Sequence, residues 1–270
     1  MSFVDLPDGA KLHFEIGGEG PAVTLIHPGL WDMRTWDREF EVLSDAGYRV
    51  LRYDVRGYGK SSRPEPGKTY SHVRDLEALL EANEIAVTAL VGCSMGGGIA
   101  LDHALVHPEQ IWALVLVASA LPGFEPTEEE EEWDSQVEAP IQAAIEADDL
   151  ERAQELSLEI WASLGTDDER GAKIRQIAFD NLHLLEMDES AQEQLDPPPA
   201  RRLEEYDVPS LILDAEHDPP YMHRIADLLA RGIMGSRKVV VQGADHVVNL
   251  RQPERFEELV LDFLAEAAPR

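Results

Sequence analysis

A serine stands between glycines at residues 92–96, which read Gly-Cys-Ser-Met-Gly and fit the pattern G-x-S-x-G. The apolar run before this serine predicts a buried strand, and the residues after it are compatible with a helix. A nucleophile on such a sharp turn sits at strained backbone angles, and glycines on either side avoid collisions with the neighbouring strand and helix. The positive end of the following helix would favour a developing oxyanion. We therefore interpret Ser94 as a nucleophile.

A serine hydroxyl is a weak nucleophile at neutral pH, so this hypothesis requires a base and a group that orients the base. His246 follows the last apolar run of the chain and precedes a helical pattern. Asp218 comes in the same way after the preceding apolar run. Because ligands bind beyond the carboxyl ends of the strands in open α/β sheets, we expect Ser94, Asp218 and His246 to meet there.

Other titratable residues compete for these roles. Asp214 is the rival acid, but it falls within the end of a predicted strand and would reach the sheet edge less easily than Asp218. His217, His103 and His107 are better explained as packing or surface residues. His103 and His107 share one helix face and could ligate a metal, yet no carboxylate partner follows at metal-site spacing. We expect no metal.

The elements that position these residues follow from an alternation of apolar runs and helical patterns. This alternation predicts an α/β fold, with a mostly parallel central β-sheet and helices on both faces. The expected strands are residues 10–16, 22–27, 48–55, 86–92, 111–119, 210–215 and 237–243. The expected helices lie near residues 32–46, 70–83, 95–107, 219–231 and 252–266. No helix separates the first two strands, which predicts that the sheet opens with this pair running antiparallel.

The alternation stops once, between Leu121 and about residue 207. This stretch shows only acidic helical pattern and ends in the helix-breaking sequence Asp-Pro-Pro-Pro. We expect residues 122–206 to be a helical insertion between two strands. Residues 1–121 and 207–270 would then form the core domain.

The composition limits the partners and the location. The net charge is −30, from 53 acidic and 23 basic residues, and it would repel nucleic acid and anionic membranes. No apolar run is long enough to span a membrane, and the N-terminal residues do not read as a signal peptide. The single cysteine, Cys93, excludes an internal disulfide and fits a reducing compartment. We expect an acidic, soluble, cytoplasmic protein that binds neither nucleic acid nor membrane, either a monomer or a homodimer.

Four motifs in order resemble the α/β-hydrolase fold superfamily, and the resemblance covers nearly the whole chain. Besides the serine motif, residues 25–36 match that family's oxyanion loop after the third strand, and residues 54–61 match its D-x-R-G-x-G-x-S turn after the fourth. The segments Glu-His-Asp-Pro-Pro and Gly-Ala-Asp-His-Val-Val are similar to its acid and histidine loops. The resemblance implies that residues 122–206 form a cap, or lid, inserted after the sixth strand.

The resemblance also implies a catalytic triad. Ser94 would be the nucleophile, His246 the general base and then acid, and Asp218 the residue that holds the imidazole tautomer. Dehalogenases and epoxide hydrolases of this fold use an aspartate at the position of Ser94, so we expect acyl chemistry rather than alkyl-enzyme chemistry. The implied reaction is two-step hydrolysis of an ester, lactone or similar acyl compound, without a cofactor.

The oxyanion hole would use the backbone N–H of Met95 and a second donor from the loop after His27. Alignment of this loop with the family pattern puts the second donor at Gly29. A shift of one residue would make it Leu30 instead, and Pro28 has no N–H to donate. Gly29 and Leu30 therefore stay as alternatives.

The cap is expected to shape the substrate pocket. The candidate lining residues are Trp31, Phe124, Trp133, Trp161 and His183, although aromatic residues at helical spacing more often belong to a cap's own core. An acidic substrate would require an arginine nearby, for which Arg34 is the candidate, but its position favours a solvent-facing role. Together with the acidic cap, this favours a small, neutral acyl substrate.

Within the superfamily, the chain looks most similar to carboxylesterases and to enzymes of the 3-oxoadipate enol-lactonase type. Carbon–carbon bond hydrolases, perhydrolases and acyltransferases share the same triad, so they are alternatives. A non-enzymatic receptor for a small ligand is a hypothesis of a different class. Every expected catalytic position carries a suitable residue type, which favours a serine esterase over a receptor.

Overall fold

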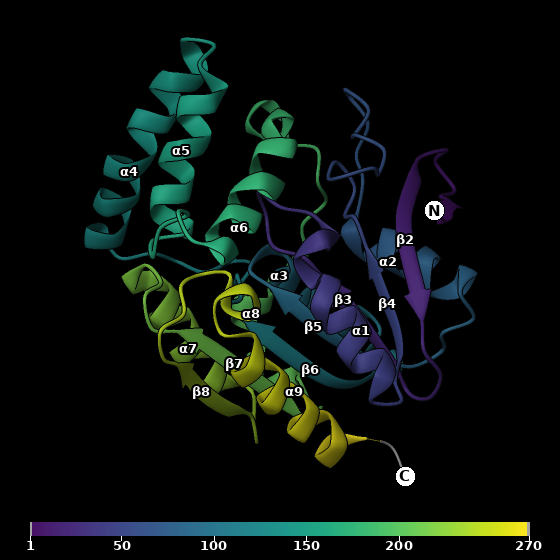
Figure 1. Cartoon of the computed structure of the whole chain (residues 1–270). Coiled ribbons are helices and arrows are strands. Elements are labelled where there is room, and N and C mark those ends of the chain that lie inside the picture. The colour runs from purple at the N-terminus through teal and green to yellow at the C-terminus, as the bar shows by residue number, and fades with distance from the viewer. Residues whose placement is uncertain (1, 269–270) are drawn as a thin grey trace.

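The computed structural model describes residues 2–268, which form a sheet of eight strands with helices on both faces (Figure 1). The order of the strands across the sheet is β1-β2-β4-β3-β5-β6-β7-β8. The strands are β1 (Ser2–Asp5), β2 (Lys11–Gly17), β3 (Ala22–Ile26), β4 (Arg49–Tyr53), β5 (Thr88–Cys93), β6 (Ile111–Val117), β7 (Ser210–Ala215) and β8 (Arg237–Val241). From β4 onward across this order, every neighbouring pair runs parallel. The expected α/β class is confirmed.

Each expected helix is present within two residues of its expected ends, and the expected helix at 32–46 begins with a short 3₁₀ turn, Met33–Trp36. The helices are α1 (Asp37–Asp45), α2 (His72–Ala82), α3 (Met95–Val106), α4 (Glu128–Glu146), α5 (Leu150–Trp161), α6 (Glu169–Asp180), α7 (Pro220–Gly232), α8 (Val248–Arg251) and α9 (Pro253–Ala267). None of the helices within residues 2–268 is both long and apolar enough to cross a membrane.

The start of the sheet differs from the expectation. The predicted antiparallel pairing of strands 10–16 and 22–27 is wrong, because β4 lies between β2 and β3. The strand β2 does run antiparallel to its neighbours, but these are β1 and β4. The connection from β2 to β3 passes the start of β4 so closely that a Cβ on Gly18 would lie 2.1 Å from the carbonyl oxygen of Tyr48. Glycine, here at φ +71°, permits this crossing.

The central strands are buried on both faces, and their side chains alternate between two apolar layers. Leu90 and Leu116 pack into the layer beneath α2, α3 and α7. Their neighbours Val91 and Val117 pack into the opposite layer, beneath α1 and α9. Burial of each such side chain contributes about 1.5–3 kcal/mol. The strands β5, β6 and β7 therefore form a rigid base for the loops that leave their carboxyl ends.

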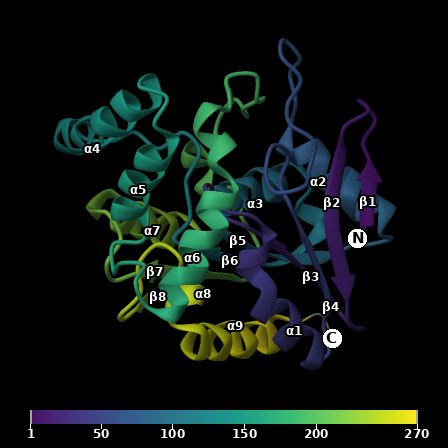
Figure 2. The ribbon, with the colours of Figure 1, turned by 45° about the horizontal axis from the view of Figure 1, so that its top comes forward.

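The chain between β6 and β7 holds α4, α5 and α6, three short 3₁₀ helices and irregular segments. Figures 1 and 2 both show α4 and α5 side by side, standing away from the sheet. The helix α4 begins with a capping box, in which the Thr127 side chain accepts from the Glu130 N–H and the Glu130 side chain accepts from the Thr127 N–H. The run of glutamates at 128–131 forms the first turn of this helix, where negative charge is favourable.

Candidate active site

Ser94 occupies the turn between β5 and α3. Its backbone has φ 50° and ψ −116°, and α3 begins at the next residue. This left-handed φ is unfavourable for a residue with a side chain. A Cβ on Gly92 would lie 2.2 Å from the carbonyl oxygen of Gly96, and a Cβ on Gly96 would lie 2.2 Å from that of Ile26. The glycines of the motif therefore allow the close approach that raises the serine out of the turn.

Asp218 and His246 meet beside one another, as the sequence predicted. The Nδ1 of His246 lies 2.9 Å from Oδ1 of Asp218, and the side chains are 3% and 1% exposed. A neutral imidazole that donates from Nδ1 to a carboxylate has its Nε2 free to accept a proton. Asp218 follows β7, and the loop that carries His246 follows β8.

The loop of His246 lies against the end of β5. The Cys93 thiol, one residue before Ser94, donates to the backbone oxygen of His246 at 3.6 Å. The N–H of His217 donates to the carbonyl oxygen of Ala244 at 2.9 Å, which joins the loop of Asp218 to the loop of His246. The three expected residues therefore occupy one edge of the sheet, at the carboxyl ends of β5, β7 and β8.

Cys93 is the alternative nucleophile nearest to Ser94. Its side chain is buried, and burial raises the pKa of the thiol well above its ordinary value, with the negative charge of Asp218 adding to the effect. Because the thiolate is the reactive form of cysteine, this thiol is inert at neutral pH. Ser94, by contrast, is only half-buried.

The rival residues have other partners. Asp214 lies 2.7 Å from Nδ1 of His223 and 2.8 Å from Nζ of Lys238. His217 is 45% exposed at its side chain and lies 3.5 Å from a neighbouring glutamate, Glu216. Within residues 2–268, no group of three histidine, cysteine or acidic side chains could hold a metal ion.

The expected oxyanion loop is held by His27, which is fully buried. Its Nδ1 donates to the carbonyl oxygen of Pro28 at 2.8 Å, and its Nε2 accepts from the N–H of Val55 at 2.9 Å. Burial lowers the pKa of His27, so the ring stays neutral and keeps this pair of bonds. Gly29 and Leu30 follow directly, both half-buried, and Leu30 has a left-handed φ of 64°. Both alternatives for the second donor stay open.

The expected pocket residues do not gather at one place. Trp161 contacts His246, with ring centroids 4.4 Å apart. Trp31 is buried and donates its indole N–H to the carbonyl oxygen of Ile174 at 2.9 Å, so it belongs to the packing between the core and α6.

Phe124 and His183 also have structural contacts. Phe124 packs on Tyr221, with ring centroids 6.4 Å apart. Nε2 of His183 lies 2.9 Å from the carbonyl oxygen of Gly57.

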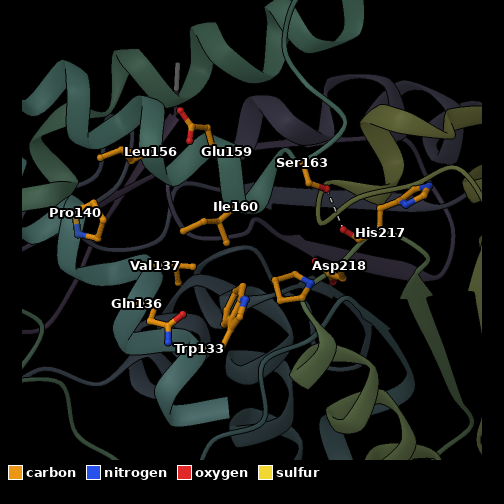
Figure 3. Close-up of a pocket in the computed structure, with 11 residues that line it drawn as sticks. Trp133, Gln136, Val137, Pro140, Leu156, Glu159, Ile160, Ser163, His217 and Asp218 are labelled. Atoms are coloured by element: carbon orange, nitrogen blue, oxygen red, sulfur yellow. Dashed lines mark hydrogen bonds between the residues drawn. The ribbon is translucent and has the colours of Figure 1, made fainter. Parts of the chain in front are cut away.

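Trp133 lines a cavity of about 500 Å³ between α4, α5 and the turn that contains Asp218. Figure 3 shows the side chains that border this space, which we call the cap groove. Its apolar wall is formed by Trp133, Val137, Pro140, Leu156, Ile160 and Pro219. Asp218 also lines the cap groove, and His246 is bonded to Asp218. Only the Asp218 side chain therefore separates the cap groove from this contact with His246.

An ion pair that the sequence did not predict involves Asp245, the residue before His246. Arg251 Nη2 lies 2.8 Å from Asp245 Oδ2, and the side chains are 6% and 1% exposed. Asp245 also accepts from the N–H of Leu164 at 3.2 Å, and Arg251 donates to the carbonyl oxygen of Gly165 at 2.7 Å. We call these four residues the clasp, because they tie the turn after α5 to the histidine loop. An acid before α8 and an arginine at its end gave no pattern that could predict this contact.

The chain is similar to known proteins over nearly its whole length. A family model described as "alpha/beta hydrolase fold" matches residues 21–253. A protein of Synechocystis, provisionally named a non-heme chloroperoxidase, is 30% identical over 94% of this chain and 94% of its own. Two solved structures share the fold. The enol-lactonase of Burkholderia xenovorans LB400 has a TM-score of 0.74 at 24% identity and covers 98% of this chain and 100% of its own. An esterase of Exiguobacterium antarcticum has a TM-score of 0.79 at 22% identity and covers 98% and 99%.

Proposed function

Since the chain belongs to the α/β-hydrolase fold family, we propose that it hydrolyses an ester or a lactone of a small, neutral substrate through an acyl-serine intermediate. The observation that carries this proposal is the buried bond of 2.9 Å between His246 and Asp218, beside a serine held at φ 50°. This pair supports the roles of base and orienting acid that we propose for His246 and Asp218, and Ser94 precedes the positive end of α3. The proposed class is carboxylesterase.

In the first step, Nε2 of His246 takes the proton of the Ser94 hydroxyl as its oxygen attacks the substrate carbonyl carbon. Asp218 stabilises the imidazolium that forms. The N–H of Met95, together with that of Gly29 or Leu30, stabilises the oxyanion. The tetrahedral intermediate then expels the alcohol, which leaves with the proton from the imidazolium. Water, activated by the same imidazole, hydrolyses the acyl-serine in the second step and restores the free serine.

The surroundings of the site support a neutral substrate. Arg34, the candidate to bind an acidic group, is already paired with Asp32 and Asp180, each at 2.7 Å. The apolar cap groove would take an alkyl or aryl substituent, and Glu159 on its border would oppose an anion. We propose that residues 122–206 act as the substrate-binding cap and that Trp133 contacts this substituent.

A second candidate reaction is perhydrolysis, in which hydrogen peroxide replaces water as the acceptor of the acyl group. The provisional name of the Synechocystis relative favours it. It shares the acyl-serine intermediate with ester hydrolysis and differs only in the second step. For either reaction we propose a cytoplasmic enzyme, monomeric or homodimeric, that needs no cofactor and binds neither nucleic acid nor membrane.

The test is turnover of p-nitrophenyl acetate and butyrate by the wild-type protein and Ser94→Ala. We expect Ser94→Ala to lose at least about a thousandfold in kcat, because triad members act as a unit. Ser157→Ala is the matched control: this serine lies in α5 and donates only to the carbonyl oxygen of Ala153, at 3.0 Å. Equal turnover by wild type and Ser94→Ala would overturn the proposal. Stabilisation by a ligand that persists in Ser94→Ala, without any product, would favour a receptor instead.

A further inference from the structure

Trp161 ends α5, and its indole lies directly against the imidazole of His246. The ring centroids are 4.4 Å apart, and the ring planes are inclined at 47°. The other tryptophan of the cap segment, Trp133, packs instead on Tyr221, at a centroid distance of 5.8 Å. Of the two tryptophans in residues 122–206, Trp161 is therefore the one whose ring contacts His246.

The turn after Trp161 is bound to both loops that carry the expected base and acid. The clasp ties this turn to the loop of His246. In addition, the hydroxyl of Ser163 donates to the carbonyl oxygen of His217 at 3.0 Å, next to Asp218 (Figure 3). The position of the indole is thus fixed relative to the imidazole through short connections on two sides.

A single hydrogen bond leaves an imidazole ring free to tilt. The bond to Asp218 fixes the Nδ1 edge of His246, but the ring can still rotate about that bond. An indole in contact with the ring blocks this rotation on its own side. When the imidazole takes up a proton, the nearby aromatic face also attracts the cation, because such attraction extends to about 6 Å from the ring centroid.

We propose that Trp161 is a positioning residue for His246, holding the imidazole at the angle from which Nε2 reaches Ser94 and favouring the imidazolium formed during acyl transfer. This role rests on the proposed hydrolase function. Asp218 is bonded to Nδ1 of the imidazole, and the ion pair of Asp245 and Arg251 joins the residue before His246 to the end of α8. Of these neighbours, only Trp161 comes from the cap.

The kinetic test compares Trp161→Leu, which keeps apolar bulk, with Trp161→Phe, which keeps an aromatic face. We expect kcat for p-nitrophenyl acetate to fall about tenfold in the leucine variant, equivalent to about 1.4 kcal/mol, with little change in KM. The phenylalanine variant should recover most of kcat. Phe179→Leu is the matched control, since Phe179 is a cap aromatic residue that packs against Arg175. An unchanged kcat with a raised KM in Trp161→Leu would overturn the proposal, and so would an equal loss in Phe179→Leu.

Tryptophan fluorescence gives a readout that does not depend on turnover. A protonated imidazole in contact with an indole quenches its emission, so emission should fall as acid protonates His246. The quenching step should be absent from His246→Gln and from Trp161→Phe. These two variants distinguish the emission of Trp161 from that of the other four tryptophans. Absence of the step from the wild type would overturn the proposed contact. A clear step, without any turnover that depends on Ser94, would leave the contact standing and overturn the hydrolase function instead.

Discussion

The substitution Asp245→Asn tests the clasp that joins the cap to the histidine loop. It keeps the shape of the side chain but removes the charge that pairs with Arg251, whose side chain is 6% exposed. Breaking a buried ion pair from one side costs about 3–5 kcal/mol, because the remaining charge stays buried without compensation. Asparagine keeps one oxygen as an acceptor, and Asp168 Oδ1 lies 4.0 Å from Arg251 Nη1, so we expect the lower end, about 3 kcal/mol. In a chain of this size, that lowers Tm by roughly 6–12 °C.

The assay is thermal and urea unfolding of Asp245→Asn and of two comparison variants. Glu258→Gln breaks the pair of Glu258 with Arg255, whose side chains are 60% and 49% exposed, so it should change the free energy of unfolding by less than about 1 kcal/mol. The double variant Asp245→Leu with Arg251→Met removes both charges and should recover part of the loss. If Asp245→Asn destabilises the protein no more than Glu258→Gln, the reasoning about the clasp is refuted.

Three further predictions concern pH and selectivity. Burial raises the pKa of Asp102 from 3.8 to about 7. As pH rises, the unfolded chain therefore loses this proton before the folded protein does. The free energy of unfolding falls as pH rises between these two pKa values. The free energy of unfolding of Asp102→Asn, measured with urea, should rise relative to that of wild type by on the order of 3 kcal/mol between about pH 5 and about pH 8. The same pH dependence in both proteins would contradict this. Filling the cap groove with Val137→Trp should lower kcat/KM for p-nitrophenyl hexanoate by about tenfold relative to acetate, and unchanged selectivity would exclude the groove as the substituent site. Finally, kcat/KM should fall with decreasing pH, because His246 must be neutral to act as a base; a flat profile would mean that another group is the base.

The sheet and the serine turn were predictable because their signals are local. Apolar runs identify the buried strands. The glycines around Ser94 indicate a close approach between backbone segments that a larger residue would prevent. β1 was missed because it has only four residues, none of them buried, at the edge of the sheet. The partner of β2 was also missed, since the sequence cannot show that β4 enters between two consecutive strands.

The meeting of Asp218 and His246 was also predictable, since each residue follows a strand at the same edge of the sheet. The surroundings of the site were not, because they depend on contacts between residues far apart in the chain. Trp161 and Trp31 look alike in the sequence, but Trp161 lies against His246, whereas Trp31 is buried and bonded to Ile174. The helices between β6 and β7 pack on the rest of the protein through such individual contacts rather than through a repeating pattern.

The proposed acyl-serine intermediate is tested by locating the acyl group during turnover. The protein is mixed with p-nitrophenyl butyrate, denatured in acid within the reaction, digested and analysed by mass spectrometry. We expect a butyryl group on the Ser94 side chain in the peptide that contains it, and no butyryl group on that peptide in Ser94→Ala. A butyryl group on another residue that is required for turnover, or full turnover by Ser94→Ala, would contradict this expectation.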